Sequence, residues 1–493
     1  MTTLVSPSTS SNAALEDLGD DKRRGEGERK PWVSRSDEQS QDLLTPEEFY
    51  TYTWKFLNDY FRGDDAYTIV KHQIDSYNDF VLKKMDQIIE GFNPIDLYHQ
   101  FLPEHGVFKH VLSVVIENPV LSKPTINEKD GSTKVMMPND ARLRNLTYSA
   151  TLSADVNVSS KTFDEETREY SCECKRVTGV NMGKIPVMVR SRYCMLTQQC
   201  SAVDGSADEC RNDYGGYFII NGNEKVIISQ DRIAENKTYV FESTKSTSYS
   251  HVAEIRSVQE NRFGVPKTTS LNLSSNASQF GRNIRIGIHH MKQDIPLFVL
   301  FRALGVESDK AIAQMVVHDL EDPIGRIVTQ ELVGSMDEAA SLGVTCTRDA
   351  LDYLARNLYA HGHPRELASN SAYRVSIVRN VLQKEFLPHT GTQFPKKALY
   401  LGYMTNKLLR CFLDIDPLDD RDAYINKRID TPGVCLANLF RQHYGKVVKY
   451  MRNMLQKEIN SDSWRATNRF INVINKHNIY KIIKSTVIES GLK

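Results

Sequence analysis

The chain has 493 residues, of which 40% are hydrophobic and 25% charged, so it is long enough for about two to four domains with sizeable cores. Lys plus Arg and Asp plus Glu number 62 each. This neutral balance argues against a freestanding protein that coats nucleic acid, because such proteins are usually basic, but it leaves room for a local basic face.

Cysteine usage and hydropathy indicate a reducing intracellular compartment. The eight cysteines include no Cys-x-x-Cys pair, and no closely spaced pair is matched by a second one, which argues against a zinc site. Cys172 and Cys174 would point the same way from a strand, and we interpret them as incidental thiols. We find no signal-peptide pattern and no apolar run of membrane-spanning length.

In chain order, the first predicted element is a disordered tail over residues 1–42, where few large apolar side chains offset the entropy of ordering. A helix is predicted to begin at Thr45, an N-cap followed by Pro46 and two acidic residues. The next helix is amphipathic. Its apolar residues recur every three or four positions and predict one buried face: Ile74, Tyr77, Val81, Met85 and Ile88, widened by Phe80 and Ile89.

Short strands and turns are predicted from about 108 to 245. Strand-like runs cover residues 111–116, 148–158 and 185–191, and Asp130-Gly131 marks a turn.

The most informative run within this region is DYGGYFIINGNEKVIISQDR, residues 213–232. Two strands, 217–220 and 224–229, flank Asn221-Gly222, a pair that tolerates the positive φ of both central positions in a type I′ turn. Gly215-Gly216 indicates a sharp chain entry or a close approach of another surface. The run predicts a β-hairpin, which by itself carries no chemistry.

Helices are predicted to dominate after about residue 310. Before them, 284–288 is expected as a strand and 295–304 as a helix or a strand–helix junction. Helical patterns then cover 375–386, 399–413 and 436–459. The expected fold class is a mixed multi-domain α+β chain with helices concentrated at both ends.

No standard catalytic or phosphate-binding motif is present. The Gly-x-x-x-x-Gly-Lys-Ser/Thr loop is absent, and Gly215-Gly216 precedes a strand rather than a helix N-terminus, so turn glycines are favoured. The histidines form no His-Glu-x-x-His motif, and His289-His290 would face opposite sides of a strand end. No metal-ligand set is predicted.

Five aspartates gather in LDIDPLDDRD, residues 413–422, where a centre for metal-dependent nucleotidyl transfer could lie, because that chemistry needs convergent carboxylates. Pro417 interrupts the segment, and Arg421 and Arg428 stand alongside to neutralise charge. A salt-bridged loop that ends a helix is therefore favoured. The aspartates are Asp414, Asp416, Asp419, Asp420 and Asp422.

Residues 441–493 contain eleven Lys or Arg against three acidic residues, a local net charge of +8 in a neutral chain. A solvated helix face and a phosphate-facing surface are both open interpretations. The second one rests on basic residues that accumulate in the final segment, interleaved with Trp464, Phe470 and Tyr480. The candidate nucleic-acid-facing residues are Arg465, Arg469, Lys476, Lys481, Lys484 and Lys493.

The hairpin sequence resembles the signature hairpin of the second-largest, beta-type subunit of multisubunit DNA-dependent RNA polymerases, of the eukaryotic and archaeal kind. Other blocks resemble the same family in the same order, over roughly residues 45–493 and nearest to the RNA polymerase II type. They are residues 123–133, 136–156, 185–196, 251–257, 292–305, 382–389, 399–409, 419–422 and 426–430, and the terminal ESGLK.

The resemblance implies an architecture of a protrusion with an inserted lobe, which together line the DNA cleft, followed by the start of a fork near the RNA–DNA hybrid. Since the family continues well past the fork, the resemblance covers only an N-terminal portion. A gene fragment, a split-gene product and an incomplete gene model are the open alternatives. The implied parts are 43–250 and 396–461 for the protrusion, 251–395 for the lobe and 462–493 for the truncated fork.

The resemblance further implies a role in transcription within an assembled nucleotidyltransferase, with this fragment inactive alone. Implied partners are the largest subunit, other polymerase subunits, the DNA template and the RNA–DNA hybrid, but no membrane. No cofactor is expected on this chain: Mg²⁺ would come from the largest subunit, and the family's zinc site lies in the missing later part. The expected location is the nucleus for a cellular source, or a virion or cytoplasmic viral factory for a large DNA virus.

Two other hypotheses remain. A protein-interaction or scaffold module without direct nucleic-acid contact would suit the neutral charge and mixed core. An independent metal-dependent nucleotidyltransferase that uses Asp414, Asp416 and Asp419 is disfavoured, because the resemblance assigns the catalytic aspartates to the largest subunit.

Overall fold

The computed structural model describes residues 45–61, 68–198, 209–210, 213–243, 248–276, 281–359, 369–461, 464, 469–475 and 477–493. The predicted disordered tail, 1–42, lies outside these residues. The chain divides into a unit that ends at Gly63 and a unit from Asp64 to Lys493. Helices and strands are both abundant, the strands form several small sheets, and the C-terminal part is helical, which confirms the α+β class.

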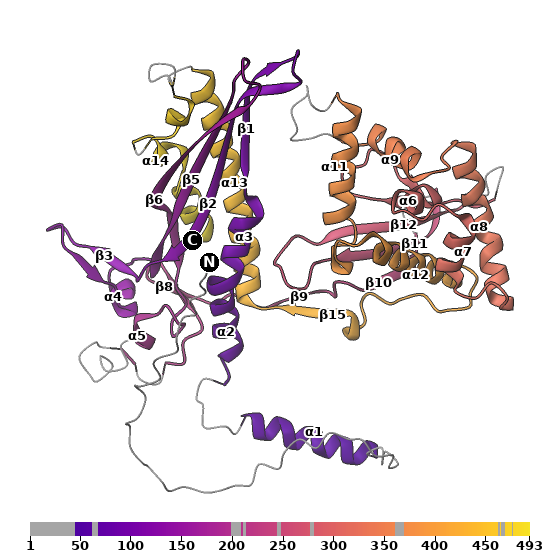
Figure 1. Cartoon of the computed structure of the whole chain (residues 1–493). Coiled ribbons are helices and arrows are strands. Elements are labelled where there is room, and N and C mark those ends of the chain that lie inside the picture. The colour runs from indigo at the N-terminus through magenta and orange to yellow at the C-terminus, as the bar shows by residue number, and fades with distance from the viewer. Residues whose placement is uncertain are drawn as a thin grey trace, which may run out of the picture. The chain divides into compact units, whose positions relative to one another are not determined.

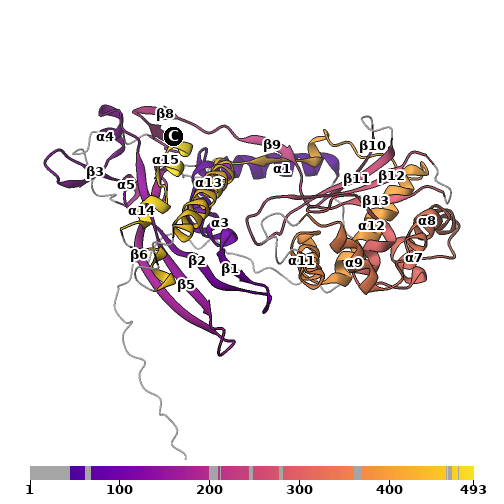
Figure 2. The same cartoon turned by 90° about the horizontal axis from the view of Figure 1, so that it is seen from above.

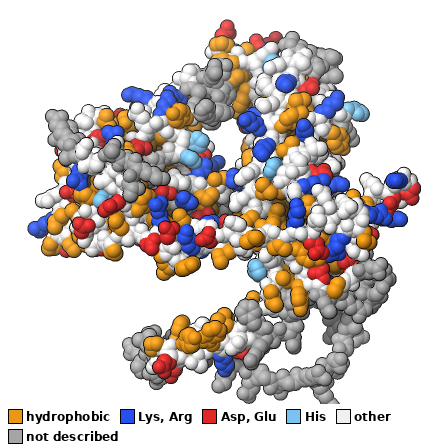
Figure 3. Space-filling view, turned by 180° about the vertical axis from the view of Figure 1, so that it is seen from behind, with side chains coloured by type: hydrophobic (Ala, Val, Ile, Leu, Met, Phe, Trp, Pro, Cys, Tyr) orange, Lys and Arg blue, Asp and Glu red, His pale blue; other side chains and the backbone are white. Residues whose placement is uncertain are grey.

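Within the first unit, helix α1 (Pro46–Phe61) begins where the sequence predicts. The backbone N–H of Glu48 donates to Oγ1 of Thr45 at 3.3 Å, and the backbone N–H of Thr45 donates to the Glu48 carboxylate at 2.9 Å. This reciprocal capping satisfies two backbone donors at the helix start. Aromatic side chains crowd the surface of α1, each at least 50% exposed (Figure 3): Phe49, Tyr50, Tyr52, Trp54, Phe56 and Tyr60.

The second unit contains two separate hydrophobic cores. The first core is built on an antiparallel sheet of four strands in the order β1-β2-β5-β6 (Figure 1). Alternate residues of β2 and β5 are buried, so one face of the sheet faces the core. The strands are β1 (Ile95–Leu102), β2 (Val107–Leu121), β5 (Ser149–Phe163) and β6 (Tyr170–Pro186).

Helices cover that face of the first sheet (Figure 2). The predicted amphipathic helix is present as α2 (Lys71–Asp79), a π-helical turn (Phe80–Lys84) and α3 (Met85–Phe92). All its predicted core residues are buried except Ile74, which is partly buried. The hydroxyl of Tyr77 donates to the carbonyl of Pro186 at 2.7 Å and ties this helix to the end of β6. Helix α13 (Pro432–Asn460) packs beside α2 and α3.

The predicted hairpin is present, but its second strand is shorter than expected. Strands β7 (Phe218–Ile220) and β8 (Asn223–Lys225) flank Asn221 and Gly222, whose φ angles of 50° and 80° confirm the turn. Prediction of one strand over 224–229 was wrong, because Val226 and Ile228 find no cross-strand partner and are 61% and 75% exposed. The next strand, β9 (Gln230–Ile233), pairs elsewhere, with β15 (Lys427–Asp430).

Gly215 confirms the close approach predicted for the entry to the hairpin. Its φ is +72°, and a Cβ atom added there would lie 2.5 Å from the carbonyl oxygen of Val189. A side chain at this position would therefore collide with the backbone that follows β6. That segment is not strand, so the strand predicted over 185–191 was wrong beyond Pro186.

The second core contains an antiparallel five-stranded sheet in the order β10-β11-β12-β13-β14. Helix α12 contacts strands β10 to β12, while α6 and α8 contact the β14 edge. Direct succession of β14 and α6 confirms the strand–helix junction predicted for 295–304. The strands are β10 (Thr238–Glu242), β11 (Tyr249–Ser257), β12 (Lys267–Ser274), β13 (Ile284–Gly287) and β14 (Ile295–Pro296).

Helices make up the rest of the second core, as the sequence predicts after residue 310. They are α6 (Leu297–Ala303), α7 (Asp309–Val317), α8 (Pro323–Ser341), α9 (Thr347–Arg356), α11 (Ser371–Lys384), the 3-10 turn η3 (Pro388–Thr390) and α12 (Phe394–Phe412). The buried residues of this core run from Val240 to Cys411. The second core is thus an insertion, and the first core resumes with α13.

The remaining short elements lie at the edges of the first core and beside β15. Strands β3 (Thr125–Asn127) and β4 (Thr133–Val135) pair around the predicted Asp130-Gly131 turn. The others are α4 (Pro138–Leu143), α5 (Met195–Gln198) and η4 (Tyr424–Asn426), with η6 (Phe470–Val473), α14 (Ile479–Ile482) and α15 (Thr486–Leu492) near the C-terminus. In the part of the chain that the structure describes, no helix is both long and apolar enough to span a membrane.

Candidate nucleic-acid interface

Helix α13 carries a basic face opposite its buried face. A stripe that includes Phe440, Tyr444 and Leu455 is buried in the first core. At 100° per residue, three of the four exposed basic residues of the helix lie on the other side of its axis, and Arg452 lies at the flank of the buried stripe. They are Lys446, Lys449, Arg452 and Lys457, and none of them forms an ion pair within the described residues.

The segment after α13 is fastened to the edge strand β6 of the sheet. The Lys175 ammonium donates to the carbonyl of Ile474 at 3.0 Å and to Oδ1 of Asn475 at 3.1 Å. Farther on, the carbonyl oxygen of Ser485 lies 2.9 Å from the position that a Cβ atom would take on Gly183, so only glycine lets the two backbones approach this closely. These contacts hold the basic C-terminal segment beside α13.

Four of the six predicted nucleic-acid-facing residues lie within the described residues, and all four are exposed. Arg469 and Lys481 form no ion pair there. The ammonium of Lys484 lies 5.7 Å from the ring centroid of Tyr450 on α13, a cation–π distance that joins the last segment to the basic helix. Lys493 is 2.9 Å from the Glu489 carboxylate, so its charge is partly offset. Arg465 and Lys476 lie outside the described residues.

The aromatic residues of this segment are mostly structural. Trp464 and Phe470 are 9% and 4% exposed and pack around His110, at ring-centroid distances of 5.2 and 4.8 Å. Tyr480, in contrast, is 62% exposed. Of the three interleaved aromatics, Tyr480 is therefore the one whose ring is largely open to a base or another partner.

Sequence reasoning counted the α13 basic residues in the local charge but did not name them as candidates. The available signal was their spacing: Lys446, Lys449 and Arg452 recur every three residues outside an apolar stripe. The positive charge of this face also affects a partly buried histidine on the same helix. Burial, assisted by the nearby charge of Lys446, lowers the pKa of His443.

The aspartate-rich loop after α12 is a salt-bridged loop, as the sequence favours. Asp416 lies 2.7 Å from the Arg410 guanidinium, and this contact lowers the pKa of the Asp416 carboxyl. Asp419 lies 2.6 Å from Lys407, and Asp422 lies 3.6 Å from Lys427. Across the described ranges, no three His, Cys, Asp or Glu side chains gather in a way that could hold a metal ion.

The predicted neutralising partners of that loop were wrong. The Arg421 guanidinium lies 4.0 Å from the ring centroid of Phe241, and Arg428 donates to the carbonyls of Ile425 and Lys427 at 3.1 and 2.8 Å. The actual partners stand on α12 and on β15. Proximity in sequence was misleading because the loop folds back on the helix that it follows.

A polar network anchors the hairpin to the first core. The Arg142 guanidinium lies 2.8 Å from Glu224 on β8 and 3.2 Å from Glu209, and it donates to the hydroxyl of Tyr217 at 2.6 Å. Tyr217 donates in turn to Asp213. Since every group has a charged or hydrogen-bonding partner, the network is a structural clamp rather than a set of groups poised for catalysis.

Comparisons with known proteins agree on one family. A family model described as RNA polymerase beta subunit matches residues 68–488 of the chain. The chain is 34% identical over 453 residues to DNA-directed RNA polymerase II subunit 2 of Arabidopsis thaliana, with 89% of this chain and 36% of the relative covered. It is 33% identical over 475 residues to DNA-directed RNA polymerase II subunit RPB2 of Schizosaccharomyces pombe, with 94% and 37% covered.

An archaeal relative is matched over more of its own length. The chain is 29% identical over 402 residues to DNA-directed RNA polymerase subunit Rpo2N of Methanococcus vannielii, with 79% of this chain and 72% of the relative covered. The chain thus spans just over a third of the two RNA polymerase II subunits, at 36% and 37%, and nearly three quarters of the archaeal one.

Proposed function

Because this chain belongs to the RNA polymerase beta subunit family, we propose that it is the N-terminal part of the second-largest subunit of a DNA-directed RNA polymerase. In the assembled enzyme it would support template-directed RNA synthesis. The observation that carries this proposal is the match over residues 68–488, which includes both cores of the second unit. The names of the relatives, two of them subunits of RNA polymerase II, support the same role.

Within that enzyme, the first core corresponds to the protrusion and the second core to the lobe. The buried residues of the second core, Val240 to Cys411, support the idea of an inserted lobe and suggest wider limits than 251–395. The segment after residue 461 is then the beginning of the fork. The partners of this chain are the largest subunit and other polymerase subunits. The DNA template and the RNA–DNA hybrid lie along the basic face of the chain.

The basic face supports direct contact with nucleic acid. Lys446, Lys449, Arg452 and Lys457 on α13 are exposed and lack ion pairs in the described ranges, and Lys484 reaches the same helix at Tyr450. Such free cations bind phosphates by releasing counterions. Lys481 and Arg469 add exposed positive charge on the C-terminal segment.

The catalytic metal of the assembled enzyme is proposed to lie on another subunit, which the salt-bridged aspartates of the described residues support. In its aspartate loop, Asp416 and Asp419 each contact a cation, which does not fit a magnesium centre. Mg²⁺ is assigned to the largest subunit and structural zinc to a later part of the second-largest subunit. The assembled enzyme is placed in the nucleus, because two of the reported relatives are RNA polymerase II subunits of eukaryotes.

The test measures the affinity of the purified chain, at several salt concentrations, for a DNA duplex that contains an RNA–DNA hybrid. The affinity of the unmodified chain should fall with salt, and Lys481→Glu with Lys484→Glu should weaken binding and flatten the salt dependence. Binding that is identical in the double variant, or that does not depend on salt, would contradict the nucleic-acid contact. RNA synthesis from NTPs by the purified chain alone would contradict its role as an inactive part of the enzyme.

A protein-interaction module without nucleic-acid contact is the second candidate function. The exposed aromatic surface of α1 favours it, because large exposed apolar patches mark protein contacts. The two functions differ in the experiment above: an interaction module would bind polymerase subunits but show no salt-dependent affinity for the duplex.

A further inference from the structure

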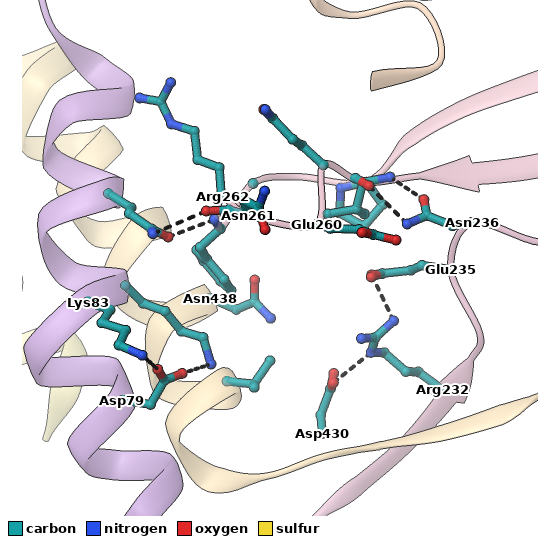
Figure 4. Close-up of a pocket in the computed structure, with 18 residues that line it drawn as sticks. Asp79, Lys83, Arg232, Glu235, Asn236, Glu260, Asn261, Arg262, Asp430 and Asn438 are labelled. Atoms are coloured by element: carbon teal, nitrogen blue, oxygen red, sulfur yellow. Dashed lines mark hydrogen bonds and ion pairs between the residues drawn. The ribbon is translucent and has the colours of Figure 1, made fainter. Parts of the chain in front are cut away.

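The two cores of the second unit approach each other at several described places, since Tyr98 on β1 lies near Tyr373 on α11, and two further places carry backbone contacts. One is the ribbon of β9 and β15, in which both strands that join the cores pair with each other. The other is the loop between β11 and β12, residues 258–266, which belongs to the second core by sequence and reaches α3 of the first core (Figure 4).

The loop is attached to the first core by Gln87 and Phe263. The backbone N–H of Phe263 donates to Oε1 of Gln87 at 2.8 Å, and Nε2 of Gln87 lies 3.5 Å from the carbonyl oxygen of Asn261. The Phe263 ring is partly buried against the first core. The Lys84 ammonium, from the π-helical turn, lies 6.0 Å from the centroid of that ring.

The base of the loop is held as well as its tip. The side chain of Asn236 donates to the carbonyl of Val258 at 3.0 Å and accepts from the N–H of Val258 at 2.8 Å. Asn236 follows β9 closely in sequence, so the base of the loop is fixed to the end of the ribbon. Movement at the tip of the loop is thereby coupled to the place where the two cores are joined.

A hollow of about 500 Å³ separates the loop tip from the ribbon. Its walls carry paired charges: Arg232 lies 2.6 Å from Asp430 and 2.7 Å from Glu235, and Lys84 lies 2.7 Å from Asp79. A polar hollow does not resist opening as a packed apolar interface would, because its lining is already compatible with water. The loop tip is therefore one element that can set the angle between the cores.

We propose that Gln87 and Phe263 form a latch that fixes the orientation of the second core, and that its release lets this core move about the β9–β15 ribbon. Both are positioning residues, since they act through the relative placement of the two cores. The proposal does not depend on what the chain binds.

The test is a distance measurement across the latch in the whole chain. Spin labels on p-acetylphenylalanine at positions 161 and 348, both exposed, would report the separation of the cores without using the native cysteines. Gln87→Ala and Phe263→Ala should broaden the distance distribution and shift its mean by more than about 2 Å. Gln87→Glu should stay close to the unmodified chain, because a carboxylate can still accept from the Phe263 N–H.

Matched controls separate the latch from general destabilisation. Gln442→Ala on α13 removes a glutamine and Tyr480→Ala on α14 removes an aromatic side chain from exposed positions, and both should leave the distribution unchanged. If Phe263→Ala fails to fold, Gln87→Ala decides, because alanine favours the helix at that position. A distribution that stays narrow in a folded Gln87→Ala chain, or one that broadens equally in the controls, would overturn the proposal.

Discussion

The ammonium of Lys407 lies 2.6 Å from a carboxylate oxygen of Asp419, and the same oxygen accepts the backbone N–H of Val240 at 2.9 Å. One carboxylate thus joins helix α12, strand β10 and the aspartate-rich loop. The aspartate most central to that loop has a structural task, and both of its bonds depend on its negative charge.

Removal of this carboxylate should destabilise the second core. Asp419→Ala leaves the Val240 N–H without its side-chain acceptor and removes the charged partner of Lys407, whose ammonium keeps only the carbonyl of Thr238. We therefore expect a loss of about 1.5–3 kcal/mol, as for hydrogen bonds to charged groups. Denaturant unfolding together with hydrogen exchange of α12 amides would measure it. Asp422→Ala is the control, because that side chain is 94% exposed and should have no measurable effect. Equal losses in both variants, or protection of the unmodified chain by Mg²⁺, would contradict the structural role.

Stability of the second core should rise at alkaline pH because of Lys397. This side chain is fully buried and donates to the carbonyl of Phe386, and burial lowers its pKa to about 8. The unfolded chain holds this proton up to a pH near 10.5, so between these two values the unfolded state binds more protons and stability increases with pH. Below about pH 8 both states are protonated, and the cost of the buried charge is constant.

The difference in unfolding free energy between the unmodified chain and Lys397→Met isolates this contribution. It should shift in favour of the unmodified chain by up to about 3 kcal/mol from pH 7 to 10.5. Lys396→Met, at the exposed neighbouring position, controls for the loss of a lysine. A difference that does not change with pH, or that changes in the opposite direction, would show that the ammonium is not held in an apolar site.

Two helical glycines should respond to alanine in opposite directions. A Cβ atom on Gly433, at the start of α13, would lie 1.9 Å from the carbonyl oxygen of Ser76 on α2, and backbone cannot yield that far. Gly433→Ala should therefore destabilise the first core by several kcal/mol, at or beyond the roughly 1–3 kcal/mol of ordinary overpacking. Gly91→Ala in α3 meets nothing within 4 Å and should stabilise by about 0.5–1 kcal/mol. Thermal unfolding of both variants checks the pair, and a Gly433→Ala chain as stable as Gly91→Ala would refute the close helix approach.

The α13 basic face should account for part of the salt dependence of nucleic-acid binding. Lys446→Glu with Lys449→Glu removes two free cations, so the slope of log affinity against log salt should fall by about 0.9 for each phosphate that is no longer neutralised. Fluorescence anisotropy with a labelled duplex at several salt concentrations measures the slope. Lys134→Glu with Lys161→Glu changes the net charge equally at exposed positions in other elements. If that control pair reduces the slope as much, the effect is one of total charge and not of this face.

Local patterns in the sequence predicted the local structure well. The Thr45 cap, the buried stripe from Tyr77 to Ile89 and the Asn221-Gly222 turn each depend on residues within a few positions of one another. The length of β8 was not predictable in this way. Val226 and Ile228 could continue a strand only if another strand paired with them. The strand that comes to this part of the chain is β15, some 200 residues later in sequence, and it pairs with β9 instead.

The same distinction applies to the candidate interface. Local net charge drew attention to 441–493, and the structure shows Lys481 and Lys484 exposed there, so their contact with nucleic acid stays a prediction for the binding experiment. Burial of Trp464 and Phe470 could not be predicted, because it comes from His110 on a strand more than 300 residues earlier. The partners of the acidic loop were missed for a different reason: the loop folds back on α12, so that Lys407, twelve residues earlier in the chain, faces Asp419.

The second core is inserted between the two strands of the β9–β15 ribbon, and this insertion has a consequence for synthesis of the chain on the ribosome. The first core needs α13 and the segment up to Leu492, whereas the second core is complete once residue 412 or so has emerged. The N-terminal sheet must therefore wait, with the apolar face of β2 and β5 uncovered, while a later stretch of sequence folds first. This reverses the usual N-terminal-first order of folding during translation, and it makes the uncovered sheet the stage at which a chaperone or an early partner subunit would matter most.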